Sequence, residues 1–434
     1  MSSKLLILIS FAIFSEIGYS LLAPLYPFLA KSHGLSDSLI GLIFSSFAIS
    51  NFIATLFTPT LIKKVGRQNL LYFGIILEGV CSICFGFISF ISNYTLFTLF
   101  SFIIRFLQGF GGAVVQTLLY SLTAAISTKD TIERNFGYIE LGCSLGVAIG
   151  PLFASVGYHF CGFEFPFILA GICEFILLKY IKHLSIDEGT SENSQTNVIN
   201  LLTNKNIFMT FLAVIIDMIS ISFIYPIFAT HIHKKFKLNP EIISLFFIVE
   251  TITYFFALQI LNTVNQKLGN KLTMVLGTLL NGTFILMLTP IRYLPQNSFT
   301  VVIGLAGLGV AGALVSIPAV IDIIDTMKHE LHIEKHTAQD YSSAIFNLGY
   351  FIGETIGPLL GGTFTDKYGF ENACNINSAF NYMFGFSFGM VVYQQLALIK
   401  VIKSKRKLSK CQDVNSNCSE YMKLNDDRNV EFDV

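Results

Sequence analysis

The chain has 434 residues, of which 53% are hydrophobic and only 13% are charged, and its formal net charge is zero. Soluble domains usually contain about a quarter charged residues, so this composition excludes an ordinary soluble domain and indicates a protein with many membrane-spanning helices. A neutral chain has no basic surplus for binding nucleic acid, and no nucleic-acid partner is expected.

A helix needs about 20 mostly apolar residues to cross the hydrocarbon core of a bilayer. The sequence contains two sets of six such segments, so we expect an all-α membrane protein with twelve transmembrane helices. The predicted spans are 5–30, 39–61, 70–91, 95–126, 136–158 and 165–184, then 206–231, 241–263, 272–292, 299–326, 340–364 and 377–400. The first apolar run continues to Ala30 without a small-residue cleavage site, so it is expected to remain as a spanning helix.

Polar stretches divide the chain. The segment from Ser185 to Lys205 is polar and has no aromatic residue, which is typical of a linker. The polar segment 401–434 is expected to be disordered. The predicted organisation is therefore an N-terminal six-helix bundle (1–184), a cytoplasmic linker (185–205), a C-terminal six-helix bundle (206–400) and a disordered cytoplasmic tail (401–434).

Lysine and arginine collect on the cytoplasmic side of membrane proteins. Their distribution here favours both termini in the cytoplasm, with basic clusters such as Lys63, Lys64 and Arg67 and the run "KVIKSKRKLSK" from Lys400 on that side. The run "HKKFK" at 233–237 is on the opposite side and does not follow the rule.

The span 95–126 contains "RFLQGFGGAVVQ", in which Arg105, Gln108 and Gly109 share one helical face. An arginine buried in a membrane is costly and is normally functional or paired. Glycines on the same face let a neighbouring helix approach closely. We expect this face to contribute to gating, coupling or packing.

Two later spans contain matching Gly-Pro elements, "GYIELGCSLGVAIGPLFAS" in 136–158 and "GETIGPLLGG" in 340–364. Proline bends a helix, and a ridge of glycines permits tight helix packing. Their positions in the two sets of six predict an internal repeat. The residues concerned are Gly137, Gly146, Gly150, Pro151, Gly357 and Pro358.

These motifs resemble those of the major facilitator superfamily over nearly the whole chain. The stretch from Arg105 to Gly109 matches that superfamily's fourth-helix motif, and the Gly150-Pro151 pattern resembles its antiporter motif, with Ala154 and Ser155 in place of the usual final Gly-Gly. The loop "PTLIKKVGRQ" keeps the Gly-Arg of the family loop but has Lys63 where an aspartate is usual. The resemblance implies the major facilitator fold, with two pseudo-symmetric six-helix bundles.

Within the superfamily, the chain is similar to the vesicular amine and polyamine transporters. The stretches "LAPLYPFLAKSHG", "GFEFPFILAG" and "YSSAIFNLGYFIGETIGPLLGGTFTDKYGF" carry this similarity. The monoamine carriers have a first-helix aspartate close to, but not at, the position of Glu16, and an aspartate where this chain has Asn347. The resemblance therefore favours the polyamine-like branch.

The stretch "IFSEIGYSLLAPLYPFLA" places Glu16 within an apolar helix, where an uncompensated charge costs about 3 kcal/mol. Glu78, Asp217, Glu250 and Glu354 also lie deep in predicted spans, whereas Glu140, Glu174, Asp322 and Asp325 are expected at helix ends. We hypothesise that several deep acids line a central cavity where cations and protons compete. The alternative is that an acid bonds a neighbouring helix or pairs with Arg105, and this alternative is preferred for Glu78, whose helix is usually peripheral. The predicted substrate- and proton-binding residues are Glu16, Ser20, Asp217, Ser220, Tyr225, Glu250, Asn347, Tyr350 and Glu354.

The sequence thus predicts a proton-coupled antiporter of cationic amines, with polyamine-like substrates favoured, working by alternating access. The alternatives are a broad organic-cation or drug antiporter of the same fold, a uniporter or carrier of a neutral or anionic solute, and a transport-inactive receptor or scaffold. No enzyme motif is present, and no cofactor or metal is expected. A monomer is expected, with lipid, a small cationic substrate and protons as partners. The tail stretch Tyr421 to Leu424 resembles a tyrosine-based sorting signal, which suggests a sorting adaptor and a vesicular or endolysosomal membrane, with the plasma membrane as the alternative.

Overall fold

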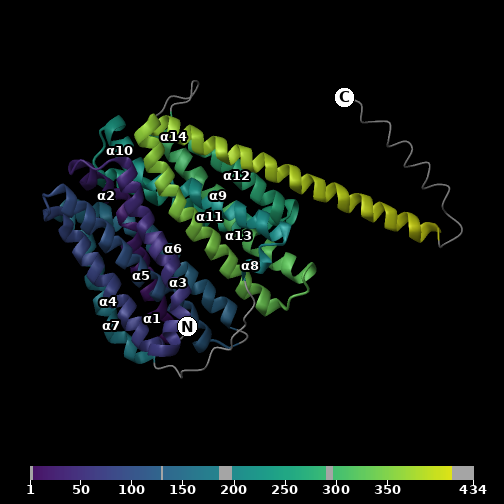
Figure 1. Ribbon diagram of the computed structural model, residues 1–434, viewed down its shortest axis with the longest axis horizontal. Helices are drawn as coiled ribbons and strands as arrows, with labels where there is room; N and C mark the ends of the chain where they lie inside the picture. Colours follow the sequence, from purple (N-terminus) through teal and green to yellow (C-terminus); the bar gives the residue numbers. More distant parts are fainter. Residues whose placement is uncertain (1–2, 129–130, 185–197, 290–296, 413–434) are drawn as a thin grey trace. The chain divides into compact units, whose positions relative to one another are not determined.

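The computed structural model describes residues 3–128, 131–184, 198–289 and 297–412, and these residues form helices without any strand (Figure 1). The first half comprises α1 (Ser3–Ser20), α2 (Leu22–Ser32), α3 (Asp37–Val65), α4 (Arg67–Phe87), η1 (Ile88–Phe90), α5 (Tyr94–Ile126), α6 (Ile132–Cys161), α7 (Glu164–Ile181) and η2 (Lys182–Leu184). After the short α8 (Val198–Leu201) come α9 (Lys205–Ser222), α10 (Tyr225–Phe236), α11 (Pro240–Leu268), α12 (Asn270–Met287), α13 (Ser298–His329) and α14 (Lys335–Gln412).

Each predicted span coincides with one of these helices, a pair of them, or part of one. The first and seventh spans are each divided in two, into α1 and α2 and into α9 and α10. The eleventh and twelfth spans both lie in α14, which is interrupted at Gly369, where a φ of 79° breaks the helix. Among the described residues, eight helical segments are long and apolar enough to cross a membrane. The other four predicted spans correspond to α7, α12 and the two parts of α14.

The described residues up to Gly385 form one compact unit, and those from Phe386 onward, which are the end of α14, are separate from it. That helix continues to Gln412, so residues 401–412 are helical where the sequence predicts a disordered tail. Lysine and arginine are good helix formers, and the helix extends through this basic run. The rest of the predicted tail, and residues 185–197 of the predicted linker, lie outside the described residues. The boundaries of the two predicted bundles stay a prediction.

The first helix of each half is interrupted at a matching place. Pro24 and Pro226 lack the backbone N–H that would bond the carbonyl four residues earlier, that of Ser20 and of Ser222. In both halves the hydroxyl of this serine donates to the carbonyl four residues before it, Ser20 to Glu16 at 2.9 Å and Ser222 to Met218 at 2.5 Å. The two halves therefore break their first helix by the same local chemistry.

Glycines of the predicted Gly-Pro elements bring two helices of each half into close contact. A Cβ added at any of four glycines would overlap the first helix of its half, so only glycine fits at this spacing. The contacts are Gly146 with Ile13, Gly150 with Ser20, Gly353 with Ile215, and Gly357 with Ser222. Gly353 and Gly357 follow Gly146 and Gly150 by the same number of residues. Their partners Ile215 and Ser222 likewise follow Ile13 and Ser20 by one common number, which is the pattern expected of an internal repeat. By contrast, Gly137 is exposed and a Cβ there would meet nothing within 4 Å.

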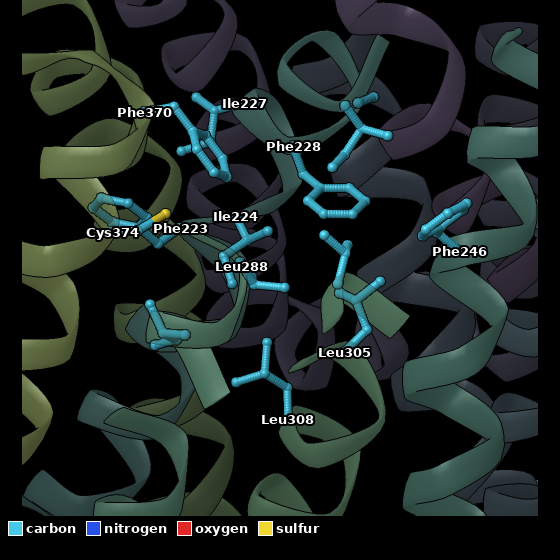
Figure 2. Close-up of a cluster of buried hydrophobic side chains, with 14 of the residues drawn as sticks. Phe223, Ile224, Ile227, Phe228, Phe246, Leu288, Leu305, Leu308, Phe370 and Cys374 are labelled. Carbon is cyan, nitrogen blue, oxygen red and sulfur yellow. The ribbon is translucent and has the colours of Figure 1, made fainter. Parts of the chain in front are cut away.

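The interior of the second half is filled by a cluster of apolar side chains around the break between α9 and α10 (Figure 2). Phe223, Ile224 and Phe228 belong to it, and α13 contributes Leu305 and Leu308. Lipid tails are as apolar as these side chains, so in a membrane such a cluster holds helices together by close packing rather than by exclusion of water. The cluster fixes the α9–α10 break against α13.

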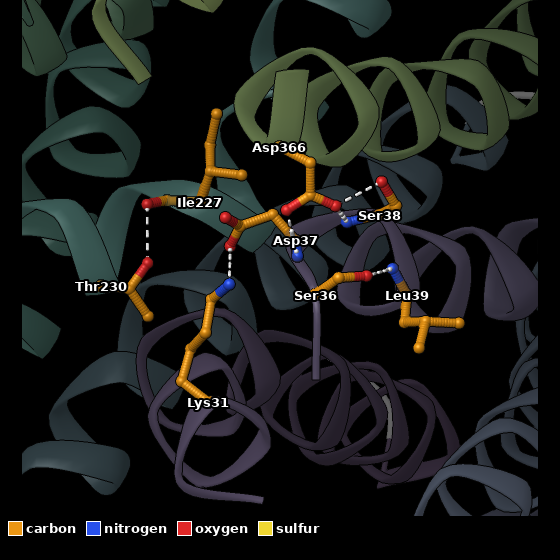
Figure 3. Close-up of polar contacts among 8 residues, drawn as sticks. All are labelled: Lys31, Ser36, Asp37, Ser38, Leu39, Ile227, Thr230 and Asp366. Carbon is orange, nitrogen blue, oxygen red and sulfur yellow. Dashed lines mark hydrogen bonds and ion pairs between the residues drawn. The ribbon is translucent and has the colours of Figure 1, made fainter. Parts of the chain in front are cut away.

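The two halves meet at one end through a carboxylate that binds a helix N-terminus (Figure 3). Asp366 of α14 accepts hydrogen bonds from the backbone N–H groups of Asp37, at 2.9 Å, and Ser38, at 2.7 Å, and from the Ser38 hydroxyl. Lys31 forms an ion pair with Asp37 at 2.8 Å. Because the N-terminus of a helix has unpaired N–H groups and a positive dipole end, a carboxylate there is favourable. We call Asp366, Asp37 and Ser38 the latch.

Other contacts between the halves involve α6 with α11, α2 with α10 and α11, and α3 with α10. His159 of α6 lies 3.6 Å from the carboxylate of Glu241 on α11. The Ser45 hydroxyl of α3 donates to the Thr355 carbonyl of α14 at 2.7 Å. The two helices also approach closely at Gly41, where a Cβ would overlap the Pro358 carbonyl. The halves are thus joined along these helices, which leaves a space between them elsewhere.

Candidate functional site

That space is a cavity of about 340 Å³, lined by both halves. The first half contributes side chains from α1, α3, α4, α5 and α6, and the second half from α9, α10, α11, α13 and α14. A volume of this size is sufficient for a small organic molecule. Five lining residues are acidic, namely Glu16, Glu78, Glu140, Glu250 and Glu354, and none of the described lining residues is Lys, Arg or His. The cavity is therefore strongly suited to cations.

Aromatic side chains make up much of the remaining wall. They come from both halves, and the electron-rich faces of such rings attract ammonium groups. The aromatic lining residues are Tyr19, Phe47, Tyr120, Tyr225, Tyr254, Phe346, Tyr350 and Phe351.

Three of the acids accept hydrogen bonds from hydroxyl groups of the wall. Tyr19 of α1 donates to Glu354 of α14 at 2.5 Å, which joins the two halves across the cavity. In the first half, Ser15 donates to Glu78 at 2.8 Å. The Tyr120 hydroxyl donates to Glu140 at 2.5 Å. These neutral partners orient the acids without compensating their charge, so the charge remains available to a cation.

Arg105 is buried beside this cavity rather than in its wall. Its Nη1 donates to Gln108 Oε1 at 2.8 Å, and its guanidinium carbon lies 4.4 Å from the centre of the Phe47 ring. No carboxylate of the described residues lies within ion-pair distance of it. It borders a smaller cavity of about 50 Å³ together with Tyr19 and Glu250. The neighbouring Gly109 packs against the Phe47 carbonyl, so this motif fastens α5 to α3.

Six of the nine predicted site residues lie in the cavity wall. They are Glu16, Tyr225, Glu250, Asn347, Tyr350 and Glu354. Ser20 lies in the wall of the smaller cavity, and its hydroxyl is bonded to the backbone of its own helix. Pro151 borders the same small cavity, while the carbonyl of Pro358 faces Gly41 of α3.

Asp217 lies behind the cavity wall, not in it. It is 1% exposed and accepts hydrogen bonds from Asn281 Nδ2 at 2.6 Å and from the Ser316 hydroxyl at 3.4 Å. Ser316 itself lines the cavity, so a single side chain separates Asp217 from it. The sequence does not show this, because the rotation of α9 depends on its packing against α12 and α13.

Ser220 is buried away from the cavity. Its hydroxyl bonds the carbonyl of Ile216 at 2.6 Å and the side chain of Asn381, whose Nδ2 donates to it at 2.7 Å. Asn377 Nδ2 also donates to the Ser220 carbonyl at 3.3 Å. The placement of Ser220 supports a packing role between α9 and α14.

Sequence reasoning assigned Glu78, Glu140 and Glu174 no role in the site. Glu78 reaches the cavity because Gly111 and Gly112 of α5 leave room for its helix, so the expectation of a peripheral position was wrong. Glu140 also lines the cavity. Glu174 is not at a helix end: it is 3% exposed and lies near the middle of α7. Its central place in the span 165–184 is the signal that could have identified it.

Comparisons with known proteins agree with this architecture. The model of the Major Facilitator Superfamily matches residues 8–199 and 210–412. The human MFS-type transporter SLC18B1 is 24% identical over 416 residues, which cover 94% of this chain and 89% of the relative. The human chromaffin granule amine transporter is 23% identical over 80% of this chain and 63% of its own length. Multidrug resistance protein 2 of Bacillus subtilis (strain 168) is 25% identical over 62% of this chain and 67% of its own.

Solved structures show the same fold. A bacterial homolog of the human lysosomal transporter Spinster, in an inward-facing and unoccupied conformation, superposes with a TM-score of 0.73 at 10% identity, covering 89% of this chain and 97% of that one. The nucleoside transporter NupG gives a TM-score of 0.70 at 12% identity, covering 90% and 99%. The described residues form helices that match the predicted membrane spans, the family model matches nearly the whole length, and the relatives are transporters rather than enzymes. The chain is therefore a multi-pass membrane protein that belongs to the Major Facilitator Superfamily.

Proposed function

We propose that the protein is a proton-coupled antiporter of cationic amines, with polyamine-like substrates favoured, that works by alternating access. The observation that carries this proposal is the cavity wall, in which five carboxyl side chains face no lysine, arginine or histidine of the described residues. Acids within a membrane are costly and usually mark an ion or proton pathway.

The distribution of the acids favours a substrate with several positive charges. Glu16, Glu78 and Glu140 come from the first half, and Glu250 and Glu354 from the second, so negative charge lies on both sides of the cavity. A polyamine has several ammonium groups along a flexible apolar chain. Its charges can reach acids of both halves while the aromatic wall contacts the chain. The name of the chromaffin granule amine transporter, a relative, refers to amines.

Antiport follows from competition at these carboxyl groups. Each can hold either a proton or an ammonium group, so binding of one favours release of the other. Since Tyr19 and Glu354 join the halves across the cavity, a change in the charge of Glu354 acts directly on a contact between them. Rocking of the halves would then expose the same site to either side in turn.

The proposal includes an orientation and a compartment. With both termini in the cytoplasm, the latch is at the non-cytoplasmic end. A vesicular or endolysosomal membrane is favoured, with the plasma membrane as the alternative, and the protein acts as a monomer. The sorting signal at 421–424 that suggests an adaptor lies outside the described residues.

Uptake into proteoliposomes tests the function. We expect a pH gradient, acidic inside, to drive accumulation of radiolabelled spermidine, and Glu16→Gln to reduce it because one cavity carboxylate is lost. A matched control is Glu371→Gln, which removes a half-exposed acid that does not line the cavity and should leave uptake unchanged. Undiminished gradient-driven uptake by Glu16→Gln would contradict the assignment of Glu16.

A broad organic-cation or drug antiporter is the second candidate, and the aromatic wall favours it together with the relative named Multidrug resistance protein 2. Competition separates the two, because tetraphenylphosphonium should displace spermidine poorly from a polyamine site and well from a drug site. If no mono-, di- or polyamine raises the melting temperature of the purified protein and none is transported, a transport-inactive receptor or scaffold is the better description.

A further inference from the structure

We propose that Glu174, buried behind the cavity wall, forms a proton-holding carboxyl pair with Glu78, which is part of that wall. That the pair contributes to coupling rests on the proposed antiport function. The statement that the pair holds a proton does not depend on that function.

Glu174 is buried without a partner. It lies in the middle of α7 and is 3% exposed, and neither of its carboxyl oxygens has a hydrogen-bond partner among the described residues. It takes part in none of the described ion pairs. An ionised carboxylate in such a place is strongly disfavoured, and the group binds a proton instead.

Among the described residues, no lysine, arginine or histidine lies within ion-pair distance of Glu174. Its two carboxyl oxygens lie over Gly18 of α1 and Gly79 of α4, each 3.2 Å from where a Cβ of that glycine would be. The titratable groups that interact with it are Glu78 and Cys81 on α4 and Cys173 on its own helix, and α1 places Gly18 next to it. Glu78 directly precedes Gly79, the glycine that a Glu174 oxygen faces, so both buried acids belong to the same contact between α4 and α7. Ionisation of one buried carboxyl group disfavours ionisation of a neighbouring one, so at least one proton belongs to the pair.

Arg105, the buried cation of this half, is engaged elsewhere, with Gln108 and with the ring of Phe47. The amide of Gln108 and the hydroxyl of Ser82 lie 3.8 Å from the same Cβ position above Gly18, so neutral polar groups surround the Glu174 carboxyl. Such groups can stabilise either a protonated or a transiently ionised acid, which is what reversible proton binding requires.

The second half has a neutral counterpart at the same place. Gly79 faces Gly171, Glu174 and Phe175, and Gly282 faces Ser378, Asn381 and Tyr382 at identical spacing. By the repeat, Asn381 therefore corresponds to Glu174, and Ser220 corresponds to Gly18. Asn381 Nδ2 donates to the Ser220 hydroxyl at 2.7 Å, so the second half closes this junction with a satisfied, uncharged pair. At the corresponding places the first half has a glycine instead of the serine hydroxyl and an acid instead of the amide, so packing of such a junction does not require an acid.

Glu78 connects this pair to the cavity. Its side chain lines the cavity and accepts a hydrogen bond from Ser15 at 2.8 Å. At rest the pair holds one proton, on Glu174, and Glu78 is ionised. A second proton leaves a hydronium ion in the cavity and binds a carboxylate oxygen of Glu78, which leaves water in the cavity and both acids protonated. The reverse transfer releases the proton to cavity water.

Infrared spectroscopy of the purified full-length protein tests the proton directly. We expect the wild type at neutral pH to show a protonated-carboxyl C=O band whose intensity falls in Glu174→Gln. The control is Glu164→Gln on the same helix, where the acid accepts a hydrogen bond from Ser89 at 2.6 Å, and it should leave the band unchanged. An identical band in Glu174→Gln and the wild type would overturn the proposal.

If Glu174→Gln does not fold, the double variant Gly18→Ser/Glu174→Asn replaces the junction with the pair found in the second half. This variant should fold and lose the same band intensity, and retention of the full band would overturn the proposal equally.

Transport then tests coupling. In proteoliposomes, Glu174→Gln should lose pH-gradient-driven accumulation of spermidine while keeping exchange of external for internal spermidine, which needs no net proton movement. Full gradient-driven accumulation in the variant would refute the coupling role while leaving the antiport function standing. A wild type that transports no amine would refute the antiport function, and the infrared result would still decide whether Glu174 holds a proton.

Discussion

The latch offers the sharpest test of how the two halves are held together. Asp366 of the second half accepts three hydrogen bonds from the start of α3, two of them from the backbone N–H groups of Asp37 and Ser38. Asp366→Ala removes all three while leaving both helices intact. We therefore expect the variant to populate conformations that are open at this end more often than the wild type.

The expected size follows from the exposure of the site. A hydrogen bond to a buried charged group contributes about 1.5–3 kcal/mol, but Asp366 is exposed, and water competes for each of its partners. Allowing about 0.5 kcal/mol for each bond, the latch contributes about 1.5 kcal/mol, which corresponds to about a tenfold change in the ratio of closed to open forms.

Double electron–electron resonance measures this ratio. Spin labels at Ser32 of α2 and Lys234 of α10, both exposed, report the separation of the halves at the latch end in a cysteine-depleted background. Glu371→Gln is the control, because its partner Lys235 lies in the same half. If Asp366→Ala and the control gave the same distance distribution, the latch would contribute nothing to closure and the reasoning would be refuted.

The latch should also resist acid. Partial burial raises the pKa of Asp366, but the bonds from the Ser38 hydroxyl and from the N–H groups of Ser38 and Asp37 outweigh it, and the pKa falls below its usual 3.8. The contribution of Asp366 is thus present above that value and lost as the pH falls through the lowered pKa, so the distance distribution should be constant from pH 7.5 down to about pH 5, as in an acidic vesicle. In α6, Gly150→Leu should abolish folding or transport because a side chain there overlaps α1, whereas Gly137→Leu should be tolerated; gel filtration and spermidine uptake distinguish them, and equal behaviour would contradict the packing argument.

Much of the fold could be predicted from the sequence because length and hydropathy determine membrane spans directly. The Gly-Pro elements also predicted the repeat, since glycine is needed wherever two helices touch backbone to backbone. Within the site, Glu16 and Glu354 were predicted correctly to face a cavity, because both lie deep in helices that are otherwise apolar.

What the sequence could not give was the rotation of each helix. Glu78 and Asp217 are equally deep in apolar spans, yet Glu78 faces the cavity and Asp217 lies behind Ser316. Small residues on neighbouring helices, such as Gly111, determine which side of α4 faces inward. Such a pairing joins residues far apart in the chain, and a single sequence contains no measure of it.

The repeat shows how Asp217 can be tested. The Ser15–Glu78 bond of the first half and the Asp217–Asn281 bond of the second occupy corresponding places, with the carboxyl group on opposite helices. The junction therefore accepts an acid on either helix, provided that the other side chain is a neutral hydrogen-bonding group. Exchanging the acid and the amide between positions 217 and 281 therefore tests whether Asp217 acts only within the packed junction.

Asn281→Asp alone would place a second buried carboxyl group against Asp217, where 2.6 Å now separates Asn281 Nδ2 from its Oδ1. We expect a loss of about 3–5 kcal/mol of stability, as when a buried charge is left uncompensated, and a lower melting temperature. The exchange variant Asp217→Asn/Asn281→Asp regains one acid and one amide, so both melting temperature and spermidine uptake should recover. Recovery of stability without recovery of transport would mean that the carboxyl group has to be on α9. Asp217 would then act in contact with substrate or proton, and the packing role indicated by its place behind the cavity wall would be refuted.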